Sequence, residues 1–65
     1  MTPQAAERAV EALLFAAAGP LALDDLAQRL GPEVDVAAAL QALQARYAGR
    51  GVELACVAER WRFQT

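Results

Sequence analysis

Residues 11–31, EALLFAAAGPLALDDLAQRLG, constrain the fold more than any other part of this sequence. The segment starts with apolar residues at helical spacing and breaks at Gly19-Pro20. It then passes through a short extended step at residues 21–23 and continues into a second helix closed by Gly31. Gly tolerates the left-handed backbone of a helix end and Pro cannot continue a helix. The segment therefore predicts two helices joined by a tight connection.

The flanking segments predict two further elements. Thr2 followed by Pro3 is a good helix start, so the first helix is expected to run to about residue 18. Asp35 is a suitable N-cap for a third helix over residues 36–48, and residues 52–65 alternate like a β-hairpin. With residues 21–23 as an edge strand, this order predicts a winged helix-turn-helix: mainly α with small β, three helices plus a β-hairpin wing.

Loop parity decides which side chains of the hairpin share a face. An even-numbered loop places the large apolar residues of both strands together. A two-residue turn at Glu59-Arg60 would set Cys56 opposite Phe63, and a four-residue loop of the same parity fits equally well. We expect Cys56 to be buried in its strand and Val57 to be an exposed apolar residue on the outer face.

The same periodicities predict one small hydrophobic core. A chain of 65 residues buries a modest share of its unfolded surface and is marginally stable alone. The expected core consists of the large apolar side chains on the inward faces, namely Val10, Leu13, Leu14, Leu26, Leu30, Leu40, Leu43, Leu54, Trp61 and Phe63.

Charge argues against a nucleic-acid-binding domain. All six basic residues are Arg, and eight acidic residues give a net charge of −2. Nucleic-acid-binding domains usually carry a basic stripe, because much of their affinity is electrostatic. The outer face of the third helix, which would read base edges, offers Gln41 and Ala45 among other alanines. We predict weak or no nucleic-acid binding by this domain.

The sequence also lacks the residues of an active site. It contains no His, no Ser and one Cys, and it has no Gly-rich phosphate loop. The acidic pairs Asp24-Asp25 and Glu33/Asp35 lie where helix capping and solvation explain them. There is no run of about 18 apolar residues that would span a membrane. We predict no enzymatic activity, no cofactor, no metal and no membrane partner, and the lone Cys suits a reducing cytoplasm.

Phe15 breaks the pattern of the first helix. Helical geometry places it on the polar arc with Arg8 and Glu11, away from the expected core. Two explanations remain open: the hairpin or the N-terminus folds over this side and buries Phe15, or Phe15 anchors a protein partner. The candidate protein-interface residues are the members of this arc and exposed positions elsewhere: Phe15, Arg8, Glu11, Gln41, Ala45 and Val57.

The ordered motifs resemble a known family. EALLFAxxxPLxL stands near the start, an Ala/Leu/Gln-rich third helix follows, and RGVELxxVxxxWRFxT ends the chain. In this order they closely resemble the N-terminal winged-helix domain of the bacterial segregation and condensation protein B (ScpB) family, over nearly the whole chain. The departures are mild: Ala22 stands where a Ser helix cap is common, and Glu59-Arg60 stands where a Gly pair is common.

The resemblance implies a non-enzymatic subunit of the bacterial SMC–kleisin, condensin-like complex, located in the cytoplasm with the nucleoid. Proteins of this kind form a homodimer, bind the kleisin subunit ScpA and through it regulate the SMC ATPase in chromosome condensation and segregation. They usually continue into a second winged-helix domain, so residues 1–65 are expected to be a single N-terminal domain of a longer two-domain protein. The alternative is a winged-helix DNA-binding transcriptional regulator whose wing residues Arg60 and Arg62 contact phosphates.

Overall fold

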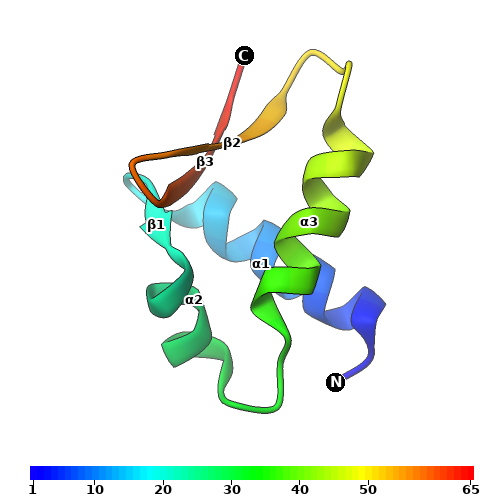
Figure 1. Ribbon diagram of the computed structural model, residues 1–65, viewed down its shortest axis with the longest axis vertical. Coiled ribbons are helices and arrows are strands. Elements are labelled where there is room, and N and C mark those ends of the chain that lie inside the picture. Colours follow the sequence, from blue (N-terminus) through cyan, green and yellow to red (C-terminus); the bar gives the residue numbers. More distant parts are fainter.

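Three helices and a three-stranded antiparallel sheet make up the fold (Figure 1). The computed structural model describes residues 1–65. In chain order the elements are α1 (Pro3–Ala16), β1 (Leu21–Ala22), α2 (Leu23–Leu30), α3 (Val36–Tyr47), β2 (Glu53–Val57) and β3 (Arg60–Gln64). This architecture is a winged helix, and it confirms the fold class expected from the sequence.

Side-chain caps set the starts of α1 and α3. The backbone N–H of Ala5 donates to Thr2 Oγ1 at 3.1 Å, and that of Ala38 donates to Asp35 Oδ1 at 3.1 Å. Each bond satisfies an amide that has no acceptor within its own helix. Both predicted caps are confirmed, although α1 and α3 end slightly earlier than predicted, at residues 16 and 47.

The start of α2 is capped from one side only. Ala22 occupies the N-cap position, and its backbone N–H donates to Asp25 Oδ2 at 3.0 Å. The Ala22 methyl group cannot return a bond, so half of a capping box is present. Leu23, expected in the extended step, is the first residue of the helix. Gly31 ends α2 as predicted, with φ at +93° and its N–H bonded to the Ala27 carbonyl at 2.8 Å.

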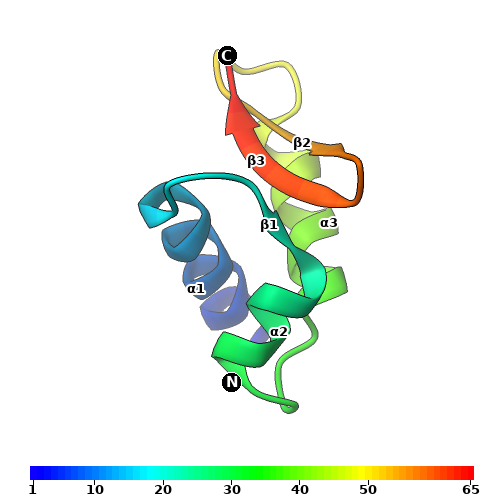
Figure 2. The ribbon, with the colours of Figure 1, turned by 90° about the vertical axis from the view of Figure 1, so that its left-hand side faces the viewer.

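The sheet has the order β1-β3-β2, so β3 is its central strand. β1 joins through the pairs Leu21↔Trp61 and Ala22↔Arg60, which confirms the edge strand predicted at residues 21–23, one residue shorter than expected. The hairpin β2–β3 lies across one end of the helices, with the N-terminus at the opposite end of the molecule (Figures 1 and 2).

The hairpin turn differs from the prediction. It falls at Ala58-Glu59 instead of Glu59-Arg60, so Cys56 opposes Trp61, not Phe63. Both turn residues adopt positive φ, +53° at Ala58 and +64° at Glu59, as a type I′ two-residue hairpin turn requires. The position of this turn could not be predicted from the sequence, because neither residue is the usual Gly or Asn. The parity of the loop is as predicted, so the assignment of faces is preserved.

The core lies between α1, α2, α3 and the inner face of the sheet. Leu26 and Leu43 are fully buried, and no polar side chain is buried with them. Of the predicted core residues, Leu13, Leu30, Trp61 and Phe63 are half-buried against this cluster and the others are buried. The buried residues are Ala6, Val10, Leu14, Leu26, Val36, Ala39, Leu40, Leu43 and Leu54.

Cys56 is exposed, so the expectation of a buried cysteine was wrong. It shares a face of the sheet with Leu54, which is 3% exposed. Cys56 lies nearer the hairpin tip, opposite the half-buried Trp61. Alternation reports which face a strand residue occupies, but it does not report how far the helices extend beneath that strand.

Candidate protein-interaction surface

Three residues of α1, each one helical turn from the next, face α3 and the hairpin. These residues are Glu7, Glu11 and Phe15, and spacing of four places them on one side of the helix. Glu7 and Glu11 are half-buried, so the expected polar arc around Glu11 is in part a seam between elements. The helical period identified the common face correctly but could not show that α3 covers it.

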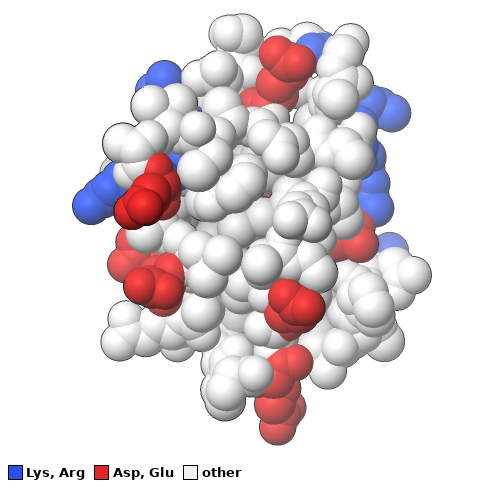
Figure 3. Space-filling view, in the orientation of Figure 1, with Lys and Arg blue, Asp and Glu red and all other residues white.

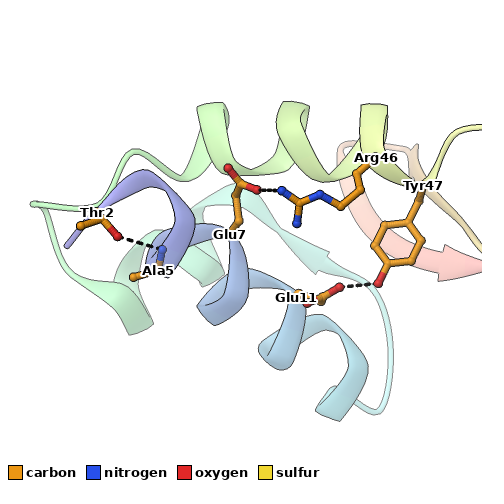
Figure 4. A network of polar contacts seen from close by, with 6 residues as sticks. All are labelled: Thr2, Ala5, Glu7, Glu11, Arg46 and Tyr47. Carbon is orange, nitrogen blue, oxygen red and sulfur yellow. Dashed lines mark hydrogen bonds and ion pairs between the residues drawn. The ribbon is translucent and has the colours of Figure 1, made fainter.

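Two polar contacts join α1 to the end of α3 along this seam (Figure 4). The Arg46 guanidinium forms an ion pair with Glu7, and the Tyr47 hydroxyl donates a hydrogen bond to the Glu11 carboxylate. The Arg46 side chain is 54% exposed, whereas that of Glu7 is 12% exposed. Because water screens an exposed ion pair, the contact between Arg46 and Glu7 adds little to stability.

The hydrogen bond to Glu11 raises the pKa of Tyr47 above its ordinary value. Desolvation of the phenol and the negative charge of Glu11 act in the same direction, and the charges of Arg46 and Arg50 oppose them. The Glu11 carboxylate accepts a hydrogen bond from the neutral phenol and would repel a phenolate. The Tyr47 side chain is therefore held in its neutral, donating form.

The third member of the row meets the hairpin through an aromatic stack. The rings of Phe15 and Phe63 are nearly parallel, with centroids 4.1 Å apart and an interplanar angle of 8°. Tyr47 contacts Phe63 edge-on, with centroids 4.9 Å apart. The hairpin thus reaches Phe15, as one explanation expected, yet Phe15 remains 57% exposed. Phe15 is neither a core residue nor an isolated surface aromatic.

An open groove of about 750 Å³ runs beside this stack. Its walls are the C-terminal end of α1 with the following loop, the segment before β2, and the end of β3. Phe15, Pro20, Val52 and Phe63 supply much of its apolar surface, and Arg62 is the charged side chain that lines it. Gln64 and Thr65 add polar atoms to the lining. Grooves that combine apolar anchors with polar groups are typical binding surfaces for protein segments.

The other candidate interface residues lie outside this groove. Arg8 is exposed on α1, and Gln41 and Ala45 are exposed one turn apart on α3. Val57, at the end of β2, is 59% exposed. The structure therefore groups Phe15 and Glu11 at one seam but does not gather all six candidates into one surface.

Four residues of this region were missing from the sequence-based site: Val52, Arg62, Phe63 and Tyr47. Phe63 was expected in the core, and both Phe63 and Tyr47 pack partly against it. Nothing in the helical or alternating pattern shows that the C-terminal strand lies next to residue 15. A contact between two aromatic residues so far apart in sequence depends on how the hairpin is placed on the helices.

A smaller cavity of about 210 Å³ lies between the starts of α1 and α3. Glu7, Glu33 and Asp35 lie around it, with Ala6 and Ala39 among the apolar lining residues. Glu7 is paired with Arg46 and Asp35 caps α3, so structural roles account for these two carboxylates. No cluster of His, Cys, Asp or Glu in the structure is suited to hold a metal ion. No helix combines the length and apolarity needed to cross a bilayer.

The face of the molecule in Figure 3 carries no continuous basic patch. Arg side chains lie toward its edges, with acidic side chains among them and a broad uncharged area in the middle. A DNA-binding winged helix would present basic and base-reading side chains on α3. Here the exposed side chains on α3 are alanines, Gln41, Gln44 and Arg46, and Gln44 Nε2 bonds to the Leu54 carbonyl at 3.3 Å.

Comparison with known proteins points to one family. A family model described as segregation and condensation complex subunit ScpB matches residues 8–65. The crystal structure of ScpB from Mycobacterium tuberculosis is similar over all of this chain, with a TM-score of 0.87 and 31% sequence identity. The chain spans 42% of the length of that protein. No curated protein matches the sequence.

The winged-helix fold, the match to the family model over nearly all of the sequence and the similarity to a solved ScpB agree with one another. The chain belongs to the ScpB family of segregation and condensation complex subunits.

Proposed function

We propose that this chain is a non-enzymatic subunit domain of a bacterial SMC–kleisin complex, which acts in chromosome condensation and segregation. Its role is to dimerise, to bind the kleisin ScpA and through ScpA to affect the SMC ATPase. It acts in the cytoplasm, at the nucleoid. The observation that carries the kleisin-binding part of this proposal is the partly exposed aromatic stack of Phe15 and Phe63 beside an open groove. Dimerisation is proposed from membership of the family.

Such a surface is costly for a small domain to leave in water. Phe15 is 57% exposed, although nine other residues of the chain are buried in its core. Partly exposed aromatic side chains beside apolar grooves are common anchors of protein–protein contacts. Burial of this surface by a partner would also stabilise a domain whose own core is small. A protein partner is therefore a better explanation of the groove than a small polar ligand.

The arrangement of α3 supports an interaction module over a DNA-binding regulator. Gln41 and Ala45 lie on the exposed side of the helix that would enter the major groove. A single Gln among alanines lacks the neighbouring donors that fix the register of base contacts. The net charge of −2 adds repulsion from the phosphate backbone.

Residues 1–65 form one winged-helix domain in this proposal, the N-terminal domain of a two-domain protein. The length of the M. tuberculosis protein supports this, since the chain spans 42% of it. Part of the surface that contacts partners would then belong to the second domain.

Sedimentation equilibrium of the chain, alone and mixed with ScpA from the same organism, tests the proposal. We expect self-association in the micromolar range or tighter and a discrete complex with ScpA. A chain that stays monomeric and does not bind ScpA at concentrations of about 100 μM would contradict both parts of the proposal.

A further inference from the structure

The groove beside Phe15 has one apolar wall that the protein already holds in place. Phe63 stacks against one face of Phe15 at 4.1 Å, and Tyr47 packs edge-on against Phe63. Tyr47 is in turn bonded to Glu11 on the same helix as Phe15. The exposed part of the Phe15 ring is therefore presented by a supported aromatic cluster. A preorganised aromatic surface loses little conformational entropy when a partner covers it.

The charge of the groove is one-sided. Arg62 lines the groove and makes no ion pair. The one salt bridge in the structure joins Arg46 to Glu7. No Asp or Glu side chain lines the groove. A guanidinium beside an apolar surface is suited to a carboxylate, which it can bind with two parallel hydrogen bonds.

This charge argues against a second copy of the chain as the occupant. In a two-fold dimer built on this groove, each residue meets the same patch of its partner. Both copies of Arg62 would then enter one interface, and neither groove supplies an acidic side chain to pair with them. Like charges placed together across an interface are unfavourable. The occupant that fits is a different chain that brings its own carboxylate.

We propose that this groove receives a segment of the kleisin in which a large apolar side chain lies close to an Asp or Glu. The apolar side chain covers the exposed part of Phe15 between Pro20 and Val52, and the carboxylate pairs with Arg62. This inference rests on the proposed function, because it names the kleisin as the protein that carries the segment. Dimerisation of the chain would use a different surface.

Two variants test the two halves of the groove, each with a matched control. Phe15→Ser removes the apolar anchor, and Val57→Ser is its control, because Val57 is 59% exposed and does not line the groove. Arg62→Glu reverses the charge, and Arg60→Glu is its control on the same strand, outside the groove. Circular dichroism melts establish that each variant is folded, and Arg62→Glu decides the question if Phe15→Ser unfolds.

Isothermal titration with full-length ScpA should show about tenfold weaker binding or worse for Phe15→Ser and Arg62→Glu. Both controls should stay within about twofold of the unchanged protein. A scan of ScpA variants with single Asp or Glu residues changed to Lys should contain one that restores binding to Arg62→Glu and weakens binding to the unchanged chain.

The other outcomes overturn the inference in different ways. If ScpA binds and all four variants bind like the unchanged chain, the groove is not the contact and the proposed function stands. If Phe15→Ser or Arg62→Glu changes self-association in sedimentation equilibrium, the occupant is a second copy. If the unchanged chain does not bind ScpA at all, the kleisin-binding function fails and this inference fails with it.

Discussion

The hydroxyl of Tyr47 donates a hydrogen bond to the carboxylate of Glu11, and this contact ties the last turn of α3 to α1. It lies next to the stack of Phe15 on Phe63, with Tyr47 edge-on to Phe63. The same phenol therefore supports both the helix seam and the wall of the groove. Its protonation state links the stability of the domain to pH.

Tyr47 should make the protein lose stability in alkaline solution. Its pKa is raised in the folded state, so the folded protein holds the phenol proton more tightly than the unfolded chain does. The stabilisation is present below the ordinary tyrosine pKa of about 10 and is lost as the pH rises through the folded value. Urea titrations between pH 8 and 11 should show a falling midpoint for the unchanged protein.

Tyr47→Phe is the control for that pH dependence. It keeps the ring contact with Phe63 but removes the hydrogen bond, so its midpoint should be lower at pH 8 and nearly flat up to pH 11. A Cys56→Ser background keeps disulfide formation at high pH out of the comparison. The sequence contains no Lys and one Tyr, which leaves few other groups to titrate in this range. Equal pH dependence in both proteins would show that Tyr47 is not the titrating group.

The hairpin turn should be open to improvement. Ala58 and Glu59 adopt φ of +53° and +64°, which costs L-residues other than Asn, Asp and Gly roughly 1–2 kcal/mol each. Ala58→Asn combined with Glu59→Gly should raise the free energy of unfolding by about 1–2 kcal/mol in urea titrations. Glu53→Gly is the control: glycine within β2 loses more conformational freedom on folding, so the free energy of unfolding should fall by about 0.5–1 kcal/mol. A turn variant no more stable than the parent would argue against positive φ at these positions.

Completing the cap of α2 should also stabilise the domain. Asp25 already accepts the N–H of Ala22, and a hydroxyl at position 22 could accept the N–H of residue 25 in return. Ala22→Ser should therefore add about 0.5–2 kcal/mol to the free energy of unfolding. Ala18→Ser, on the exposed loop after α1, should change it by less than about 0.5 kcal/mol. If the two substitutions have the same effect, the gain does not come from capping.

Shortening a buried side chain on the core face of α3 should greatly lower the stability of the domain. Leu43 is 0% exposed, so Leu43→Ala should cost about 2–5 kcal/mol, a large share of the stability of so small a domain. Leu23, which is 37% exposed, offers a matched control, and Leu23→Ala should cost less than about 1 kcal/mol. Thermal melts followed by circular dichroism measure both, and a Leu43→Ala variant that melts like its parent would contradict this placement of α3.

DNA binding by this domain should be weak and independent of α3. Gln41→Ala should leave any affinity for duplex DNA unchanged, because no neighbouring side chain fixes the register of a lone Gln. Arg60 and Arg62 could supply two phosphate contacts, so log K against log salt should fall with a slope no steeper than about −2. Gel shifts across a salt series measure this. Sequence-selective binding that disappears with Gln41→Ala would restore the alternative of a transcriptional regulator.

The sequence by itself determined the order of elements and the inward face of each one. Thr2 and Asp35 have the side chains that cap helices, Gly31 has the backbone freedom that ends one, and Leu43 recurs with its neighbours at the helical period. These are local properties, set by backbone chemistry and by which residues share a face. The net negative charge and the alanines of α3, which argue against DNA binding, are likewise properties of the sequence alone.

Tertiary structure alone decided what covers each outward face. Glu11 and Phe15 belong to a polar arc by period, but Tyr47 and Phe63 lie against them because α3 and the hairpin pack on that side. Cys56 follows the expected alternation and is nevertheless exposed, since it lies toward the hairpin tip. Periodicity fixes directions around one element, whereas burial depends on the distances between elements. Those distances emerge only when helices and strands pack together.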